Sequence, residues 1–255
     1  MKIATWNVNS LRVRLPHVLE WLAREQPDVL ALQETKTENT KFPAAELAEA
    51  GYRAVYSGQK TYNGVAVLSR SEAAEPATDI EGLDDPQRRI LAVTVGGVRI
   101  VDLYVPNGSE VGSDKYAYKL DWLARVRTWL RGELERHPRL VVLGDFNIAP
   151  DDRDVHDPEA WRDKILCSVP ERDAFRALLD LGLSDTFRAF EQPEQSFTWW
   201  DYRMNGFRRN LGLRIDHILA SSAMGCLACH IDKAPRALER PSDHAPVVAE
   251  FRRVD

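Results

Sequence analysis

The sequence predicts an α/β fold in which two mixed β-sheets pack face to face and helices cover the outside. Tyr62-Asn63-Gly64 lies between two strand-like runs, and Asn-Gly accepts the positive φ angles of a hairpin turn, so the first half has antiparallel character. The run 140–143 is continuously apolar, which is typical of a strand covered on both faces. The run 245–251 alternates between two faces. Neither a purely parallel sheet nor an all-β barrel accommodates these patterns together.

The individual elements follow from the spacing of apolar residues. Helical spacing is clearest at 115–136, where Leu120, Leu123, Leu130 and Leu134 share one face that we expect to pack on a sheet. The other helices are expected at 13–25, 43–50 and 171–181. Strands are expected at 2–8, 28–34, 52–57, 62–69, 89–95, 98–105, 139–145, 195–200, 213–220 and 245–251.

Length and composition favour one folded unit. With 255 residues, 44% of them hydrophobic, the chain can bury a sizeable core, and we expect a single domain over 1–255. No apolar run reaches about 18 residues and no signal-peptide core follows Lys2, so we expect a cytoplasmic protein. The three cysteines are too few for a disulfide framework. Cys226 and Cys229 have metal-like spacing, but without a second pair they do not predict a zinc site.

The net charge of −5 excludes a protein that coats nucleic acid through bulk positive charge. Basic residues are nonetheless clustered, and a local cluster can contact phosphates while carboxylates elsewhere set the total. The alternative for most of these residues is a solvated surface position. The clusters comprise Arg12 and Arg14, Arg88 and Arg89, Lys115 and Lys119, and Arg203, Arg208, Arg209 and Arg214.

Polar residues lie at the boundaries of four predicted strands. Buried strands rarely finish in such groups for stability alone, since each group must be desolvated and hydrogen-bonded. A single polar residue at a strand boundary is usually a turn former or a cap, so the inference of a polar site rests on the whole group of residues. We expect a single polar site that contains Asn7 and Asn9, Glu34, Asp145 and Asn147, and Asp243 and His244.

Strand geometry groups some of these side chains. Because side chains alternate along a strand, Asp145 and Asn147 share one face. Asp216 lies in an apolar run, so its charge needs a partner, and a histidine is a natural one. His244 can supply that group, and we expect Asp243 to hold His244 in place.

This set of residues favours phosphodiester hydrolysis. Oxygen ligands from Glu, Asp and Asn suit Mg²⁺ or Mn²⁺ rather than zinc. A histidine against a carboxylate has its protonated form favoured and can polarise a phosphate oxygen or move a proton. Asp145 could orient a water molecule for in-line attack. Metal-assisted phosphodiester hydrolysis uses every member of the set. An acyl-transfer triad is less favoured, because no Ser or Cys occupies a nucleophile elbow.

Five segments resemble the motifs of the exonuclease III family, a branch of the endonuclease/exonuclease/phosphatase superfamily. They occur in the family's order over essentially the whole chain, which makes the resemblance specific. The segments are Trp-Asn-Val-Asn-Ser-Leu-Arg at 6–12, Leu-Gln-Glu-Thr-Lys at 32–36, Gly-Asp-Phe-Asn-Ile at 144–148, Gly-Leu-Arg-Ile-Asp at 212–216 and Ser-Asp-His-Ala-Pro at 242–246.

The resemblance implies a four-layer, DNase I-like α/β sandwich and a Mg²⁺-dependent DNA repair nuclease, with Mn²⁺ as the alternative ion. Such enzymes act on double-stranded DNA. They cut 5′ to abasic sites, remove nucleotides or blocking groups from 3′ ends, or do both. We also expect a monomer that does not bind membranes.

Site residues are also implied by family position. Catalytic roles fall on Tyr104, Asp145, Asn147, Asp216, Asp243 and His244. Metal ligands are expected among Asn7, Glu34, Asp145, Asn147, Asp243 and His244, with Glu34 as the main one. DNA contacts are expected from Asn9, Arg12, Arg89, Asn107, Trp199 and Leu213.

Three of these residues have a simpler interpretation. Tyr104 alone would be taken as a packed aromatic residue, because its ring is mostly a hydrophobic group. Adjacent Trp199 and Trp200 point to opposite faces of a strand, so at most one can line a surface pocket. The resemblance places Trp199 and Leu213 near an apolar pocket for a flipped, base-free sugar. Either could equally belong to the core.

Two departures from the family pattern concern the substrate. Leu166 lies where related enzymes approach that pocket, and we hypothesise that its bulk disfavours the abasic sugar and shifts activity toward 3′-end trimming. Glu110 and Asp114 lie in a loop that would be expected to face DNA and to be basic. Because this loop is acidic, the sequence does not define which surface contacts DNA.

Two alternatives remain at the level of function. Phosphoinositide and sphingomyelin phosphodiesterases share the metal core of the superfamily, but 87–89 and the tryptophan pair resemble the nuclease branch, and no membrane-binding amphipathic segment is evident. A non-catalytic DNA-binding module is the other alternative. An inactive descendant should have lost at least one core residue, whereas this chain retains Glu34, Asp145, Asn147, Asp216 and His244.

Overall fold

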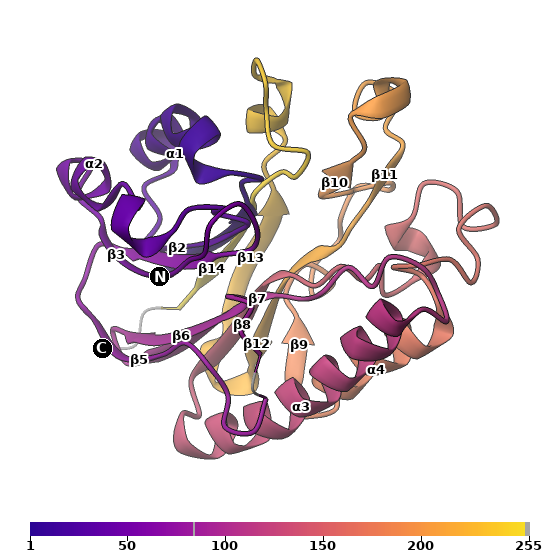
Figure 1. Cartoon of the computed structure of the whole chain (residues 1–255), viewed down its shortest axis with the longest axis horizontal. Coiled ribbons are helices and arrows are strands. Elements are labelled where there is room, and N and C mark those ends of the chain that lie inside the picture. Colours follow the sequence, from indigo (N-terminus) through magenta and orange to yellow (C-terminus); the bar gives the residue numbers. More distant parts are fainter. Residues whose placement is uncertain (84, 253–255) are drawn as a thin grey trace.

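Two six-stranded mixed β-sheets pack face to face in the computed structural model, which describes residues 1–83 and 85–252 (Figure 1). Helices cover the outer face of each sheet, as Figure 1 shows. This arrangement confirms the predicted fold of two mixed sheets with helices outside.

The first sheet contains the first and the last strand of the chain. Only β1 and β2 run parallel in it; the other neighbouring strands are antiparallel. Helices α1 (Leu11–Glu25) and α2 (Ala44–Glu49) lie on its outer face (Figure 1). The strand order is β13 (Cys226–Ile231), β14 (Val247–Phe251), β1 (Lys2–Asn7), β2 (Val29–Gln33), β4 (Val65–Ser69) and β3 (Arg53–Ser57).

The second sheet has one parallel pair, β7 with β8. Helices α3 (Asp114–Arg136) and α4 (Val169–Leu179) lie on its outer face (Figure 1). The strand order is β5 (Ala73–Ala77), β6 (Ile90–Val95), β7 (Val98–Tyr104), β8 (Leu140–Asp145), β12 (Asp216–Ser221) and β9 (Leu183–Asp185). A small ribbon of β10 (Trp199–Trp200) and β11 (Gly212–Leu213) stands beside it. Short 3₁₀ turns occur at Asn39–Lys41, Asp152–Asp154, Arg203–Asn205, Ser222–Met224 and Ala234–Ala237.

The core lies in three layers. Between the sheets, buried side chains such as Ile3, Val29, Ile100 and Leu143 form one apolar cluster. A second cluster packs α3 and α4 on the second sheet, and a third packs α1 and α2 on the first. On α3, Leu123 and Leu130 are buried against the sheet with Trp122 and Val126, and Leu134 packs beside them, as the leucine spacing predicts. Leu120 is the exception, because it lies outside this cluster and lines a hollow next to α4.

The loops that precede α3 and α4 end at well-capped helices. The Ser113 side chain accepts a hydrogen bond from the Tyr116 N–H and caps the start of α3. At α4, the Glu171 carboxylate accepts the Ser168 N–H, as in a capping box, and a proline lies in the first turn. These caps fix the loops that precede both helices.

Three observed strands were not predicted. β5 contains a proline, β9 has only three residues, and β13 (Cys-Leu-Ala-Cys-His-Ile) is a largely uncovered edge strand with an irregular register. β5 and β9 lack the apolar run that identifies a central strand, and the apolar run of β13 is only four residues long before His230. The strand expected at 195–200 is wrong in extent, because only Trp199–Trp200 pair.

The Asn63-Gly64 segment does lie between two antiparallel strands. β3 and β4 pair with Ser57 opposite Val65, and residues 58–64 connect them. Asn63 and Gly64 have φ angles of 53° and 92°, as the sequence predicts. A Cβ on Gly64 would lie 2.2 Å from Thr35 Oγ1, so glycine is required where this loop approaches the segment after β2.

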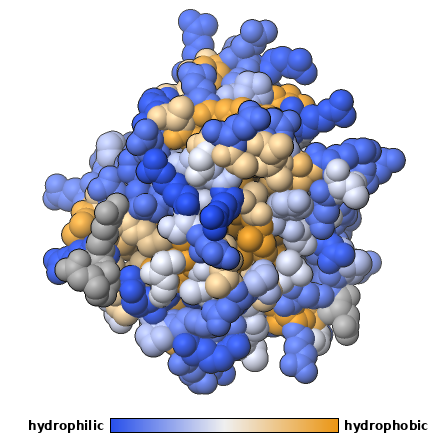
Figure 2. Space-filling view, turned by 90° about the vertical axis from the view of Figure 1, so that its left-hand side faces the viewer, coloured by the Kyte–Doolittle hydropathy of each residue, from blue (hydrophilic) through white to orange (hydrophobic). Residues whose placement is uncertain are grey.

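β1 begins and β14 ends at the same end of the sandwich (Figure 1). Figure 2 views the molecule from this side, and hydrophilic residues cover most of the surface there. β1 and β2 both run away from this end. No helix in the described part of the chain is long and apolar enough to span a membrane.

Candidate active site

The polar residues at the strand boundaries meet at the opposite end of the sandwich, between the two sheets. Asn7 ends β1 and Glu34 follows β2, so both emerge from the first sheet. Tyr104 and Asp145 end the parallel strands β7 and β8 and lie opposite each other in register. Asp216 starts β12 and pairs with Asp145. The site therefore forms because these strand ends share one edge.

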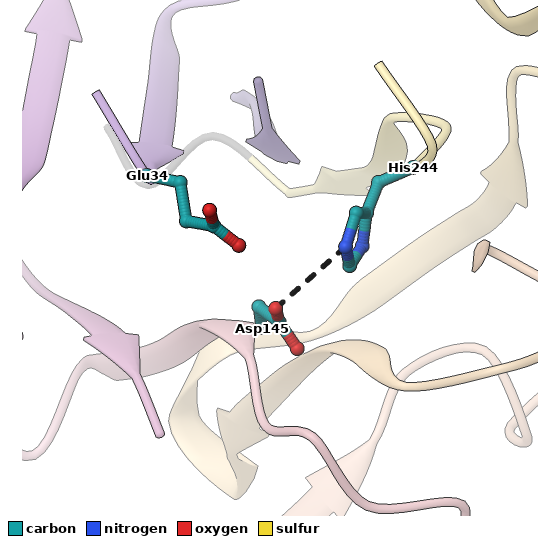
Figure 3. Close-up of side chains that lie close together, drawn as sticks. All are labelled: Glu34, Asp145 and His244. Atoms are coloured by element: carbon teal, nitrogen blue, oxygen red, sulfur yellow. Dashed lines mark ion pairs between the residues drawn. The ribbon is translucent and has the colours of Figure 1, made fainter. Parts of the chain in front are cut away.

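Glu34, Asp145 and His244 form the centre of the site, and Figure 3 shows their side chains converging from three segments. One ligand atom from each lies within 4.8 Å of the others. Asn7 Nδ2 donates hydrogen bonds of 2.9 Å to Glu34 Oε1 and of 2.9 Å to Asp145 Oδ2. The amide therefore ties the carboxylates of the two sheets together.

The imidazole of His244 lies between two carboxylates. Its Nδ1 is 2.8 Å from Asp216 Oδ2, and its Nε2 is 3.8 Å from Asp145 Oδ2, the ion pair drawn in Figure 3. Burial lowers the pKa of His244, but the charges of Asp216 and Asp145 outweigh burial and raise the pKa above its ordinary value. His244 is thus a buried cation with its ring orientation set by Asp216.

The expectation that Asp243 holds His244 is wrong. Asp243 Oδ1 accepts a hydrogen bond of 2.9 Å from Asn9 Nδ2, and its Oδ2 accepts one of 3.0 Å from Trp199 Nε1. Adjacent residues at a strand start point in different directions, so the carboxylate next to His244 in sequence faces the loop carrying Asn9. Asp216, which the sequence identified as an acid in need of a histidine, is the partner.

Asp145 is almost completely buried, and its environment favours proton uptake. Burial raises its pKa, and the charges of Asp216 and Glu34 raise it further, whereas His244 and Asn7 oppose the shift. Its Oδ1 accepts the Asn147 N–H at 2.9 Å. Asp145 is therefore held by fixed donors and is suited to accept a proton.

Asn147 lies beside Asp145, as expected, but a turn after β8 brings it there and not strand periodicity, because β8 ends at Asp145. Its Nδ2 donates to Val105 O at 3.0 Å, and its Oδ1 accepts a hydrogen bond of 3.2 Å from Asn107 Nδ2. The φ angle of 50° turns the chain sharply here, in the left-handed region that asparagine tolerates. Asn107 remains exposed and connects the site to the surface.

Tyr104 packs beneath Arg89. The guanidinium carbon of Arg89 lies 4.6 Å from the centre of the Tyr104 ring, and Nη1 donates to Tyr104 O at 3.2 Å. Burial raises the pKa of Tyr104 well above its usual range, and the charges of Glu34 and Asp145 add to the effect. The hydroxyl therefore keeps its proton and can donate a hydrogen bond.

Trp199, Leu213 and Leu166 belong to one apolar cluster beside the polar site. Leu213 and Leu166 are buried, whereas Trp199 is half-buried and opposes Leu213 in the small ribbon. Trp200 points to the other side and is buried against Phe207, as the alternation predicts. The Leu166 side chain occupies this cluster, so it does point inward as hypothesised.

Lys36 is a site residue that the sequence reasoning did not assign. Its Nζ lies 2.9 Å from Glu34 Oε2 and 2.6 Å from Asn9 Oδ1. Glu34 and Lys36 have φ angles of 50° and 51°, which bring their side chains together although they are two positions apart. Lys36 belonged to a motif, but strand alternation gives no signal for a residue outside the strand.

Two hollows that contain basic residues lie near the site and border each other at the loop 59–63. One has a volume of about 600 Å³ and includes Arg12, Lys36, Lys41 and Lys60 in its lining. The other has a volume of about 430 Å³, and its lining includes Arg89, Asn107 and Lys115. Of the residues expected to contact DNA, Arg12 lies in the first hollow, and Arg89 and Asn107 lie in the second. Asn9, Trp199 and Leu213 lie nearer the polar centre.

The donor set suits a divalent cation. Glu34 and Asp145 offer carboxylate oxygen atoms from facing sheets, the hard ligands that Mg²⁺ or Mn²⁺ prefers. Asn7 and Asn147 direct their amide nitrogens toward these carboxylates, while their oxygens accept hydrogen bonds from Asn9 N and Asn107. Among the described residues, the cluster of potential ligands does not include Asp243.

The fold and the site together define the class of protein. The chain belongs to the Endonuclease/Exonuclease/phosphatase family, which it matches over residues 4–244. Nucleases of this family are metal-dependent, and Glu34, Asp145 and His244 could hold an ion. The chain is an exodeoxyribonuclease III-like nuclease and therefore a hydrolase.

Individual relatives narrow the comparison. Exodeoxyribonuclease III from Haemophilus influenzae is 36% identical over 99% of this chain and 100% of its own length. The structure of the 3′-5′ exonuclease NExo from Neisseria meningitidis has a TM-score of 0.97 and 54% identity, with 98% of this chain and 99% of that chain covered. The structure of the 3′ phosphatase NExo from Neisseria bound to a product DNA hairpin has 53% identity over 99% of both chains and a TM-score of 0.97.

An AP endonuclease from Archaeoglobus fulgidus is also similar. It has a TM-score of 0.95 and 39% identity, and the match covers 98% of this chain and 99% of that chain. Both 3′-end enzymes and AP endonucleases therefore share this fold with the chain.

Proposed function

We propose that this chain is a Mg²⁺-dependent DNA repair phosphodiesterase that acts on duplex DNA and prefers 3′ ends to abasic sites. The observation that carries the preference is the buried position of Leu166 in the apolar cluster with Leu213 and Trp199. The two NExo structures, a 3′-5′ exonuclease and a 3′ phosphatase, support the same preference.

Glu34 and Asp145 would hold the ion, with Mn²⁺ as the alternative to Mg²⁺. When bound, the ion neutralises charge on the phosphate and polarises its oxygen atoms. Asn7 keeps both carboxylates in place by donating to each. Asp243 and Asn147 remain proposed ligands, reached only if their present hydrogen bonds rearrange.

The chain's own groups would carry the chemistry. Asp145 orients a water molecule and accepts its proton as the oxygen attacks phosphorus; the bond to the 3′ oxygen breaks, and this oxygen takes a proton from solvent to leave as a 3′ hydroxyl. His244 and Tyr104 would donate hydrogen bonds to the phosphate oxygens as charge develops. Asn147 can join them once its amide leaves Val105 O or Asp145. Asp216 keeps the His244 cation oriented.

Duplex DNA fits the distribution of charge around the site. Each basic hollow includes a direct neighbour of the site, Lys36 beside Glu34 in the first and Asn107 beside Asn147 in the second, so phosphates of a DNA backbone could be bound next to the catalytic residues. The contacts are with backbone phosphates, which a repair enzyme can read without base sequence. The monomeric state, the cytoplasmic location and the single domain over 1–255 remain predictions.

Abasic sites are disfavoured as substrates for a steric reason. A base-free sugar that flips out of the duplex needs an apolar pocket beside the catalytic residues. Here Leu166 is 5% exposed and Leu213 is completely buried, so the space between them is filled by side chains. A 3′ terminal phosphate needs no such pocket, because the end of the strand can enter the polar site directly.

Labelled duplexes that carry a 3′-phosphate, a recessed 3′ end or an abasic-site mimic test the proposal. With Mg²⁺, we expect the wild-type chain to process both kinds of 3′ end faster than the abasic site, and a chelator to stop all reactions. In Leu166→Gly the abasic-site rate should rise at least tenfold, since the φ of 72° suits glycine and the pocket opens.

Cys167→Ala is the matched control, because it loosens the same cluster without removing the Leu166 side chain. It should leave the ratio of the two activities unchanged. Unchanged abasic incision in Leu166→Gly would reject the steric argument. If the wild-type chain cleaves none of the duplexes, the phosphodiesterase proposal fails and a phosphoinositide or sphingomyelin substrate, or a non-catalytic DNA-binding role, takes its place.

A further inference from the structure

A buried ion pair joins α3 and α4 behind the site. The Lys119 ammonium and the Glu171 carboxylate are bonded to each other, and both side chains are completely buried. Lys119 Nζ also donates to Asn147 O at 2.7 Å and to Asn107 O at 3.1 Å. An ammonium has three donors, and all three are used here. Two of the three hold backbone carbonyls of residues in the active site.

The Glu171 carboxylate holds a third segment. Its Oε1 accepts the Leu166 N–H at 3.1 Å, and its Oε2 accepts the Ser168 N–H at 3.1 Å and the Ser168 hydroxyl at 2.7 Å. The ion pair therefore connects the loop with Asn107, the loop with Asn147 and the segment that carries Leu166.

These three segments also contact one another directly. Gly108 has a φ of 91°, and a Cβ there would lie 2.9 Å from Ile165 Cδ1 and 3.1 Å from Lys119 Cδ. The Ala149 N–H donates to Leu166 O at 2.8 Å. A shift of any one segment would therefore displace the others, with the ion pair at their junction.

An ion pair is a costly way to pack two helices. Burial removes both charges from water, and apolar side chains of similar volume often stabilise such a position as well or better. Apolar side chains, however, cannot bind the carbonyls of Asn107 and Asn147 or the Leu166 N–H. The polar contacts account for the retention of charge at this position.

We propose that Lys119 and Glu171 are positioning residues of the active site, which fix Asn107, Asn147 and Leu166 relative to one another. They touch no substrate and act through the backbone of the three loops. The inference rests on the proposed function for its kinetic consequence, but the positioning itself can be measured without activity.

The test uses the full chain with both charges removed together, in Lys119→Met/Glu171→Gln, so that no charge is left buried alone. The control is Arg99→Met/Glu133→Gln, which removes another buried ion pair with its Glu on α3, of 2.7 Å and with side chains 5% and 2% exposed. Glu133 lies near the other end of α3, away from the site loops. Thermal unfolding confirms that both variants fold.

On a 3′-phosphate duplex, we expect kcat of the first variant to fall by roughly 10- to 100-fold while KM changes by less than about threefold, because displaced catalytic groups cost rate more than binding. The control should keep the wild-type kcat. Equal losses of kcat in the two variants would show a general effect of stability and overturn the proposal.

Hydrogen exchange of backbone amides gives an answer that does not depend on activity. In Lys119→Met/Glu171→Gln, exchange should accelerate together at 105–109, 146–149 and 165–168, and it should not do so in the control. If the three segments of Lys119→Met/Glu171→Gln exchange at the same rates as in the wild-type chain, the positioning role is overturned, even if the chain cleaves DNA. A wild-type chain without nuclease activity, in contrast, would reject only the proposed function.

Discussion

His244 Nδ1 lies 2.8 Å from Asp216 Oδ2, and this contact determines how the imidazole is presented to the site. Asp216 and Asp145 are paired in register on neighbouring strands, so their carboxylates lie on two sides of one ring. The buried carboxylate fixes the ring and stabilises its charge. Asp243, the neighbour of His244 in sequence, contacts Asn9 and Trp199 instead.

Replacement of Asp216 tests this assignment of partners. Asp216→Asn removes the charge that stabilises the protonated ring, so we expect kcat to fall by about 10²- to 10⁴-fold, the usual size of a proton-transfer contribution. Asp243→Asn should cost less, because it leaves the His244 contact intact. Steady-state rates on a 3′-phosphate duplex measure both, and a larger loss in Asp243→Asn would contradict the assignment.

Metal binding should be visible as stabilisation. Mg²⁺ at ten times its dissociation constant adds about 1.4 kcal/mol to the free energy of unfolding. For a chain of this size that corresponds to a rise in Tm of about 3 to 6 °C. Scanning calorimetry with and without Mg²⁺ measures the shift. Glu34→Gln lacks the charge of one metal ligand, so Mg²⁺ should raise its Tm little or not at all. An equal rise in Tm in both proteins would show that the ion binds elsewhere.

His217 should make stability depend on pH. Burial, followed by the charge of Arg214, lowers the pKa of His217 from 6.5 to about 4, and nearby Asp185 and Asp154 oppose the shift only in part. The unfolded chain therefore takes up a proton that the folded chain refuses as pH falls from 6.5 to 4. This costs about 3 kcal/mol of stability over that range.

Urea unfolding at pH 7 and pH 4.5 measures this loss. His217→Gln cannot be protonated, yet its amide can still donate to Ile148 O, the contact that His217 Nε2 makes at 2.9 Å. The wild-type chain should lose more stability than the variant between the two pH values. The raised pKa of Asp145 acts in the opposite direction in both proteins, so the difference isolates His217. Parallel losses would show that His217 is not held neutral.

The sequence predicts the site well where residues lie at strand boundaries. Apolar strand patterns identify the central strands, and the ends of these strands meet at one edge. The site residues at these ends therefore come together, namely Asn7, Glu34, Asp145 and His244. The strands β5 and β9 were missed because one is a polar edge strand and the other has three residues. Neither has an apolar pattern to detect.

The interactions behind the site could not be predicted from the sequence. Lys119 belonged to the clusters of basic residues for which phosphate contact or a solvated surface position was expected. Helical spacing gives no sign that its ammonium is buried and bonded to Glu171 and two backbone carbonyls. Asp102 is likewise completely buried, where it accepts a hydrogen bond of 2.7 Å from Gln33 Nε2, and burial raises its pKa well above the usual range. Both depend on loops and sheets distant in sequence.

The most direct test of the account is the rate at which the wild-type chain and Asp145→Asn release phosphate from a 3′-phosphate duplex with Mg²⁺, under single-turnover conditions. Asn preserves the shape of the side chain and can still pair with Asn147 N, but it cannot accept a proton from water. We predict rapid release by the wild-type chain and a rate lower by about 10⁴-fold in the variant, with unchanged DNA binding. Comparable rates in the two proteins would contradict the account.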